Sequence, residues 1–598
     1  MLSSLKELYS LLTHDQRKGL LRLQCLIGLT AVAEMASIFS IGPFMALVAD
    51  MSHLQGDGIL AQLYRASALG SPEDFLFWLG VGVLGALTVA ACVSMYSNWR
   101  LAYYGQQLGA ELSTRLYRHY MQQCWLFHAS GNSSQLINKI NGECIRLTNQ
   151  VITQFLQLNA RAILALVIAV AILIYNPLVA LMGIGLFAAA YLLLYRIVRR
   201  RLVANGQIVT KTNRERMKLM QEGFGGIKDT LLLGRQADFN ERYSAANQAF
   251  GRAQGTNTVM AQVPRYAMEL VAFGAIIMLV LYLLRSNQGD LGTVLPVLAV
   301  YALAGFKLLP AFQHIYASAA TLRSNLAAFD NLKVDLEASR KAVVDKPAEA
   351  QGRKVARKQI SLENVRFRYP GKDEWALDNL TLTLPLNQVI GVVGASGSGK
   401  STAIDILLGL IEPDEGSLCI DGQPLRSDEL RAWQNNIGYV PQSIFLADAS
   451  IRENIAFGLP LTGIDDERVE RAARMAHLDD LLGRLPLGLN TLVGERGVQL
   501  SGGERQRIGI ARALYDDADV LVLDEATSAL DGITERLVMD AIHDFSGHKT
   551  IIIIAHRLST VKSCNRIYLM DNGVVVDSGV YDELALRNEI FQRMTEHA

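Results

Sequence analysis

The chain has few cysteines and few charges for its length of 598 residues. Its six cysteines are scattered, and no two of them have the close spacing of a metal-ligating pair. Buried thiols in a reducing compartment are therefore expected, and a disulfide framework is not. Charged residues make up only 19% of the chain, with 57 basic residues balancing 57 acidic ones. The overall charge therefore indicates neither a nucleic-acid partner nor an acidic one.

Apolar residues, by contrast, are abundant and make up 50% of the chain. With so little charge, this composition is typical of a protein that is partly membrane-embedded and partly soluble. The length fits two or three domains. A cleavable signal peptide is not expected, because the first apolar stretch follows a polar segment, is too long for a signal core and lacks a clear cleavage site.

Long apolar runs alternate with charged stretches through the first part of the chain, and about 20 residues are needed to cross a bilayer. The runs predict six membrane-spanning helices, at Leu20–Ala49, Phe75–Tyr96, Leu158–Tyr175, Leu178–Leu194, Val259–Leu284 and Leu291–Leu309. Asn176 and Pro177 predict a tight turn between the third and fourth helices.

Basic residues gather before the first apolar run and after the second and fourth runs. Because cytoplasmic loops of membrane proteins are rich in Lys and Arg, both chain ends are predicted to be cytoplasmic. The two cytoplasmic loops keep a helical pattern, interrupted once each at residues 127–134 and 223–226. These interruptions predict the turns farthest from the membrane. On the outer side, apolar residues at helical spacing over 59–68 predict either a short amphipathic helix on the membrane face or a loop packed on the spans.

A change of pattern marks the second half of the chain. Polar and basic residues without an apolar period predict a linker, and strands alternate with helices from Ile360 onward. The sequence thus predicts a membrane domain at 1–335, a linker at 336–358 and an α/β domain at 359–598.

The most specific pattern lies between a strand and a helix. Val389–Val393 predicts the strand, and the next eight residues, 394–401, have the sequence Gly-Ala-Ser-Gly-Ser-Gly-Lys-Ser before a predicted helix at 402–410. In a phosphate-binding loop of this kind, backbone N–H groups and the helix N-terminus hold phosphates. Lys400 is then expected to meet the β and γ phosphates and Ser401 to ligate Mg²⁺.

A second apolar strand, Val520–Leu523, ends in Asp524 and Glu525. The first carboxylate can hold Mg²⁺ and the second can polarise an attacking water. Acidic residues after a buried strand are common by themselves. Together with the phosphate-binding loop, they predict a P-loop NTPase.

A third motif, Leu-Ser-Gly-Gly-Glu-Arg-Gln, occupies residues 500–506 and opens a predicted helix. Ser501, Gly502 and Gly503 at a helix start form a second anion site. A chain with its own phosphate-binding loop does not need another site for its own ATP, so this one is predicted to serve the ATP of a second copy.

This motif resembles the signature of the ABC ATPase family. The resemblance implies that Tyr369 stacks on adenine, although a core tyrosine is the alternative, and that Gln442 reaches Mg²⁺ and the attacking water. It also implies that residues 494–497 contact the intracellular loops, that Asp531 crosses the dimer and that His556 meets the γ-phosphate. The residues implied to hold ATP are Tyr369, Gly394, Ala395, Ser396, Gly397, Ser398, Gly399, Lys400, Ser401, Thr402, Ser501, Gly502, Gly503, Glu504 and Asp531. The implied catalytic residues are Glu525, His556 and Gln442, and the implied Mg²⁺ ligands are Ser401, Gln442 and Asp524.

In the family, two ATPase domains close head to tail with each ATP between one phosphate-binding loop and the opposite signature. Since this chain has one of each, the resemblance implies a homodimer, with a heterodimer as the alternative. A membrane domain followed by an ATPase on one chain resembles an exporter or flippase.

Charges inside predicted spans are costly unless they serve a cavity or a partner. Arg265 and Lys307 predict a basic cavity for an anionic headgroup such as a pyrophosphate. The alternative is that both lie near the interface, or that they pair with Glu269 and Glu34.

The first span, through residues 33–39 and 42–50, resembles the bacterial flippases of lipid-linked oligosaccharides used in protein glycosylation, as do residues 225–234. This resemblance implies ATP-driven flipping of a polyprenyl-pyrophosphate glycan across the bacterial inner membrane, with the ATPase domain cytoplasmic and membrane lipids and the glycan lipid as partners. An exporter of lipid A, other lipids or hydrophobic drugs would share every ATPase motif and stays open, and a peptide exporter is a further alternative. A soluble ABC ATPase that acts on DNA or ribosomes would lack the six spans.

The fold predicted by these patterns is an α-helical six-span transmembrane domain of the ABC exporter type followed by an α/β P-loop NTPase nucleotide-binding domain.

Overall fold

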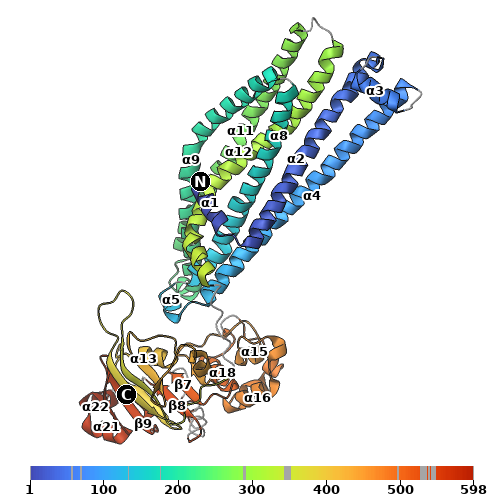
Figure 1. Ribbon diagram of the computed structural model, residues 1–598. Helices are drawn as coiled ribbons and strands as arrows, with labels where there is room; N and C mark the ends of the chain where they lie inside the picture. The colour runs from blue at the N-terminus through green and yellow to red at the C-terminus, as the bar shows by residue number, and fades with distance from the viewer. Residues whose placement is uncertain are drawn as a thin grey trace. The chain divides into compact units, whose positions relative to one another are not determined.

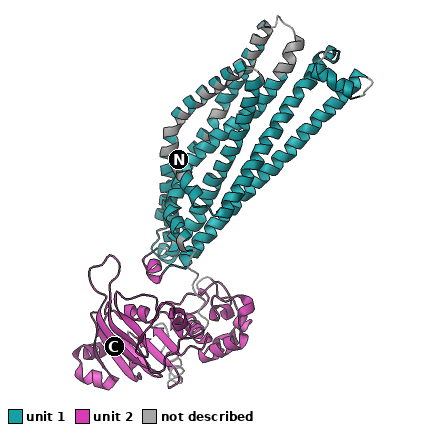
Figure 2. Cartoon of the chain, viewed as in Figure 1, with its two compact units in different colours: residues 1–123, 131–345 teal, residues 124–130, 346–598 magenta. Residues whose placement is uncertain are grey.

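The computed structural model describes the chain except residues 1, 56–57, 68–70, 132, 176, 287–290, 343–351, 495–496, 526–531, 533–534, 536–538, 540–546, 556 and 597–598. The chain divides into two compact units (Figure 2). The first comprises residues 1–123 and 131–345, and the second comprises residues 124–130 and 346–598.

The first unit is helical, with long helices that run side by side (Figure 1). Its helices are α1 (Leu2–Ser10), α2 (His14–Ala49), η1 (Met51–Leu54), α3 (Ile59–Ala66), α4 (Pro72–Met121), α6 (Ser133–Ile137), η2 (Asn138–Glu143), α7 (Cys144–Arg146), η3 (Leu147–Ile152), α8 (Thr153–Tyr175), α9 (Pro177–Gly225), α10 (Ile227–Leu232), α11 (Gln236–Ser286) and α12 (Leu291–Ala342).

Each predicted span falls within one of the long helices α2, α4, α8, α9, α11 and α12, which confirms the helical membrane domain. Among the described residues, three stretches are long and apolar enough to cross a bilayer: His14–Ala49, Pro72–Met121 and Gln135–Ile174. Four of the long helices have 49 to 52 residues, more than the roughly 20 that a bilayer requires. They therefore continue beyond the membrane, as the helical pattern of the loops predicts.

Local sequence explains where several of these helices begin. Thr13 caps α2 in a reciprocal capping box with Gln16, and Ser71 caps α4 ahead of Pro72 at the first helical position. Helix α8 ends at Tyr175 and α9 begins at Pro177, which agrees with the predicted boundary, and Asn176 itself lies outside the described residues. These caps satisfy N–H groups that a helix start otherwise leaves without partners.

The interruptions in the two loops differ in length from the prediction. The first contains the short helices α5 (Trp125–Ser130) and α6. The second does not end at residue 226, because α10 follows and Gly234, with φ of +64°, turns the chain before α11. Residues 124–130 pack with the second unit.

The outer segment combines the two predicted alternatives. Residues 59–66 form the helix α3, and Leu60 and Tyr64 pack on a buried cluster that includes Leu47 and Phe75. The rings of Tyr64 and Phe75 lie 5.3 Å apart, edge to face. The segment is thus a helix that is packed on the spans.

The second unit is an α/β domain with two sheets. The strands are β1 (Gln359–Phe367), β2 (Leu377–Pro385), β3 (Val389–Val393), β4 (Glu415–Ile420), β5 (Gln423–Pro424), β6 (Ile437–Val440), β7 (Val520–Asp524), β8 (Thr550–Ile554), β9 (Arg566–Asp571) and β10 (Val574–Gly579). The helices are α5, α13 (Lys400–Leu407), α14 (Leu430–Gln434), α15 (Ile451–Ile455), η4 (Leu461–Gly463), α16 (Asp466–Met475), α17 (Asp479–Arg484), η5 (Gly488–Asn490), α18 (Gly502–Tyr515), α20 (Leu558–Val561), α21 (Tyr581–Arg587) and α22 (Glu589–Glu596).

The larger sheet has the strand order β10-β9-β3-β8-β7-β6, and its five strands from β9 to β6 are parallel. Strand β3 is buried along its whole length. Its alternate residues belong to different core clusters, Val389 and Val393 to one, Ile390 and Val392 to the other. A sheet covered on both faces accounts for the continuous apolar run that predicts this strand.

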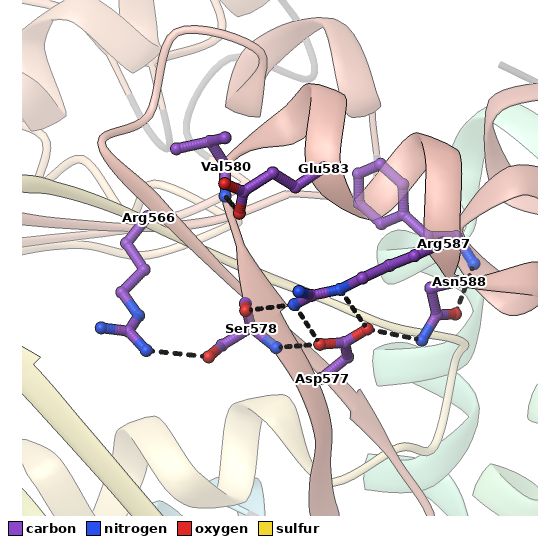
Figure 3. A network of polar contacts seen from close by, with 8 residues as sticks. Arg566, Asp577, Ser578, Val580, Glu583, Arg587 and Asn588 are labelled. Carbon is purple, nitrogen blue, oxygen red and sulfur yellow. Dashed lines mark hydrogen bonds and ion pairs between the residues drawn. The ribbon is translucent and has the colours of Figure 1, made fainter.

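A polar network holds the C-terminal helices to β10 (Figure 3). The Arg587 guanidinium on α21 donates to Asp577 on β10, with 2.6 Å between Nη2 and Oδ1, and Asn588 donates to the same carboxylate at 3.1 Å. Burial alone would raise the pKa of Asp577, but these hydrogen bonds and the N–H of Ser578 hold it below its ordinary value.

The domain boundaries stay a prediction. Helix α12 continues to Ala342, past residue 336 where the predicted linker begins. Most of the remaining linker, residues 343–351, lies outside the described residues.

Candidate nucleotide and transport sites

The phosphate-binding loop has a backbone that only glycine adopts readily. Gly394, Gly397 and Gly399 have φ values of +155°, +82° and +96°. A Cβ on Gly394 would lie 2.1 Å from the carbonyl oxygen of Met570. The close approach of β9 therefore requires glycine here.

Lys400 begins α13 and lies inside the loop, with 5% of its surface exposed. Its Nζ donates to the carbonyl oxygens of Gly394 and Ala395, at 2.9 Å each. Burial lowers the pKa of the ammonium group, and the negative charges of Glu525 and Asp524 oppose this shift. The predicted phosphate-binding lysine and the predicted acidic pair thus belong to one electrostatic site.

The neighbours of Lys400 differ in exposure. Ser396 and Ser401 are exposed, whereas Ser398 and Thr402 are buried. The hydroxyl groups of Thr402 and Tyr369 are hydrogen-bonded at 3.0 Å. Tyr369 is half-buried with its ring edge-to-face on Phe367, at 5.1 Å. The tyrosine therefore lies beside the loop helix, and its contact with adenine stays a prediction.

Two of the three predicted catalytic residues meet. Gln442 donates from Nε2 to Oε2 of Glu525 at 2.8 Å. Strands β6 and β7 are parallel neighbours, so the residues that follow them reach the same edge of the sheet. Glu525 has φ of +47°, a left-handed conformation that is uncommon outside glycine.

Asp524 ends β7 and lies 3.5 Å from the hydroxyl of Tyr439, which donates to it. Burial and the charge of Asp524 raise the pKa of Tyr439. Sequence reasoning did not identify Tyr439 as a site residue.

Asp405 on α13 was also missed. Burial raises the pKa of its carboxyl to about 6, a hydrogen bond with the Trp125 side chain opposes the shift, and the charge of Asp524 adds to it. An acidic residue within the apolar part of the helix that follows the phosphate-binding loop, residues 403–407, was the available signal.

The signature motif opens α18 as predicted. Ser501 is the N-cap, and its hydroxyl accepts from the N–H of Glu504 while the Glu504 carboxylate accepts from the N–H of Ser501. Arg484 of α17 donates to the same carboxylate at 2.9 Å. Gly502 and Gly503 form the first turn. The Glu504 carboxylate is thus engaged within its own unit, and its contact with ATP stays a prediction.

His556, Asp531, Glu495 and Arg496 lie outside the described residues. The predictions for these four residues therefore have no structural counterpart.

One of the two residues predicted to line the substrate cavity, Lys307, forms an ion pair in the structure. Lys307 of α12 lies 3.4 Å from the Glu34 carboxylate of α2, the pairing that the sequence left as an alternative. Ser94 of α4 donates to the other Glu34 oxygen at 2.5 Å. The Glu34 side chain is 7% exposed and that of Lys307 is 42% exposed. The side chain of Arg265 lies outside the described residues.

The chain matches the ABC transporter family over residues 377–528 and the ABC transporter transmembrane region over residues 39–305. It belongs to the ABC transporter family, as a multi-pass membrane protein with an exporter-type transmembrane domain and an ATP-hydrolysing nucleotide-binding domain.

Among its relatives is an ATP-dependent lipid A-core flippase of Cupriavidus metallidurans, 30% identical over 536 residues, or 87% of each chain. A protein of the same name from Vibrio vulnificus is 28% identical over 578 residues, 93% of this chain and 95% of the other. The solved structure of a bacterial Atm1-family ABC exporter with ATP bound has the same fold, with a TM-score of 0.74 at 22% identity over 97% of this chain and 99% of that one.

Proposed function

We propose that the protein is an ATP-driven flippase for a lipid with an anionic headgroup, of the lipid A type, in the bacterial inner membrane. Relatives named lipid A-core flippases match both domains over most of their length, which favours the lipid exporter over the glycan-lipid cargo. The ATPase domain is cytoplasmic in this proposal, because basic residues follow the second and fourth spans.

In the ATPase cycle, Lys400 exchanges the carbonyls of Gly394 and Ala395 for phosphate oxygens, and Glu525, held by Gln442, accepts a proton from the attacking water. His556 contacts the γ-phosphate. These roles rest on the family resemblance and on the way the loop, Gln442 and Glu525 are arranged.

Ser401, Gln442 and Asp524 would hold Mg²⁺, which when bound neutralises phosphate charge. All three offer oxygen ligands, which Mg²⁺ prefers. Among the described residues, no group of three or more His, Cys, Asp and Glu side chains could hold a metal by itself.

Two copies of the chain form the working unit. One phosphate-binding loop and one signature helix per chain require a partner if each ATP lies between the two motifs. Exposed apolar residues in the second intracellular turn, Phe224 at 75% and Leu232 at 84%, are suited to burial against another surface.

The observation that carries the headgroup assignment is the Lys307–Glu34 pair. A half-exposed ammonium paired with a buried carboxylate inside a membrane domain is costly, and such groups face a partner or a pathway. A phosphate of the lipid would compete with Glu34 for Lys307. In this proposal, the lipid phosphate replaces Glu34 as the ion-pair partner of Lys307 when the headgroup binds.

A polyprenyl-pyrophosphate glycan is the second candidate cargo. The first-span resemblance favours it. An apolar cavity of about 590 Å³ lined by α2, α3 and α4, including Pro43, Leu63 and Val83, would suit the lipid chains of either candidate. A long lipid chain could occupy such a cavity.

The test is ATPase activity in nanodiscs with a lipid A-core glycolipid, a polyprenyl-pyrophosphate glycan or a hydrophobic drug. The proposal predicts stimulation by the first that Lys307→Ala removes. Stimulation by the polyprenyl glycan alone would select the second candidate. Stimulation by drugs alone, unchanged in Lys307→Ala, would contradict both.

A further inference from the structure

Gln506 is the last residue of the signature motif and lies on α18, the helix that Ser501 caps. Its side chain contacts Glu525, the proposed general base of the same chain. Gln506 is 3% exposed on α18. Its Nε2 donates to the backbone carbonyl oxygen of Glu525 at 3.3 Å. The signature helix and the end of β7 are thus joined by one side chain.

The backbone of Glu525 has an unfavourable conformation that requires support from its neighbours. Its left-handed backbone, with φ of +47°, is unfavourable for a side chain with a Cβ and persists only where neighbours fix it. The N–H donates to Ile554 of β8 at 3.0 Å, the carboxylate accepts from Gln442, and the carbonyl accepts from Gln506. Gln442 therefore contacts the carboxylate itself, while Ile554 and Gln506 hold the backbone from which the carboxylate projects.

The other end of the Gln506 amide is unusual. Its Oε1 is buried and has no hydrogen-bond partner within the described part of the chain. A buried amide with unused hydrogen-bonding capacity is unfavourable for folding. A leucine or methionine would fill similar space without this cost, so a purely structural filler does not account for glutamine here.

We propose that Gln506 is a positioning residue: by holding the Glu525 backbone, it fixes the position of the Glu525 carboxylate relative to the signature helix α18. Ser501 at the start of this helix is the proposed contact for the second copy's ATP. Gln506 therefore links the helix that follows this contact to the residue proposed to activate water. The inference rests on the proposed roles of Glu525 and of the dimer.

The test compares Gln506→Leu and Gln506→Met in the full-length transporter, two apolar variants of similar volume, so that a folding defect in one does not decide the result. Gln434→Leu is the matched control. Gln434 on α14 donates from Nε2 to the carbonyls of Leu408 and Gly409, at 3.3 and 3.2 Å, and so makes the same kind of bond elsewhere in the domain.

The expected result is a kcat for ATP lower by roughly 10- to 100-fold in the Gln506 variants, the scale of a misplaced catalytic group. KM, affinity for ADP and thermal stability stay at the control's values. Adding Glu525→Gln to Gln506→Met lowers turnover no further than Glu525→Gln does alone, because the two residues act as a unit.

Wild-type turnover in Gln506→Met, with turnover abolished in Glu525→Gln, would overturn this inference alone. So would a parallel loss of ADP affinity and stability in both Gln506 variants, which marks a structural role. Wild-type turnover in Glu525→Gln itself would instead remove the proposed role of Glu525 and the inference with it.

Discussion

The side-chain amide of Gln442 donates to the carboxylate of Glu525, with 2.8 Å between Nε2 and Oε2. The two residues are 83 positions apart in the chain. They meet because the parallel strands β6 and β7 end at the same edge of the sheet. A polar side chain is thus placed to orient the carboxylate proposed as the general base.

Glu525→Gln is expected to lower ATP turnover by roughly 10²- to 10⁴-fold, the range for loss of a general base. ATP binding should persist, because the phosphate-binding loop is unchanged, and the ATP-bound dimer should accumulate. Turnover and nucleotide retention measured on the purified transporter check this. Asp428→Asn, which changes an exposed carboxylate paired with Arg426, is the control and should behave as wild type.

Lys400→Ala should weaken ATP binding by roughly 10- to 100-fold, as expected for loss of charged hydrogen bonds to phosphate. Binding of a fluorescent ATP analogue measures the effect. Lys549→Ala, which removes a lysine paired with Asp517, is the control. Equal affinity in the two variants would exclude Lys400 from the phosphate site.

Glu34→Gln should strengthen lipid stimulation. It removes the negative charge that competes for Lys307, so the concentration of anionic glycolipid giving half-maximal ATPase stimulation should fall by about fivefold, equivalent to roughly 1 kcal/mol. Lys307→Ala should raise it. Titration of the lipid in nanodiscs measures both. An equal response of both variants to the anionic glycolipid would show that the pair has only a packing role.

Asp577→Asn should loosen the C-terminal helices by about 1 kcal/mol, since it weakens hydrogen bonds to a charged group that is partly screened. The folded-state pKa of Asp577 is below the unfolded value, so its contribution is present near neutral pH and is lost as pH falls through the folded pKa.

Hydrogen exchange of α21 and α22 measures this difference. The variant should exchange faster than wild type at pH 7, and the two should converge as the pH falls below about 4. Asp582→Asn, an exposed carboxylate on α21, should stay close to wild type. A difference that does not change with pH would contradict the charge-based explanation.

Sequence reasoning succeeded where a function depends on neighbouring residues. The strand, loop and helix around Lys400, the helix start at Ser501 and the boundary between the helices that end at Tyr175 and begin at Pro177 are local, and each agrees with the prediction. The long helices follow from apolar runs that are longer than a bilayer needs.

Contacts between distant segments could not be found in this way. Gln506 was part of a quoted motif, but its bond to Glu525 depends on how α18 packs against β7. For Lys307 the sequence left a cavity and a pair with Glu34 as alternatives, and the ion pair itself became visible only in the structure, because charge in a helix does not by itself identify its partner. The hydrogen bond between Asp405 and Trp125, which lie far apart in the chain, is likewise visible only in the structure.

The most direct test of the account is lipid movement in proteoliposomes. A lipid A-core glycolipid is incorporated, and its headgroup is detected with a reagent that does not cross the membrane. The account predicts that ATP with Mg²⁺ changes headgroup exposure for the wild-type protein and not for Glu525→Gln. Full ATP hydrolysis by the wild-type protein without any movement of the glycolipid would contradict it.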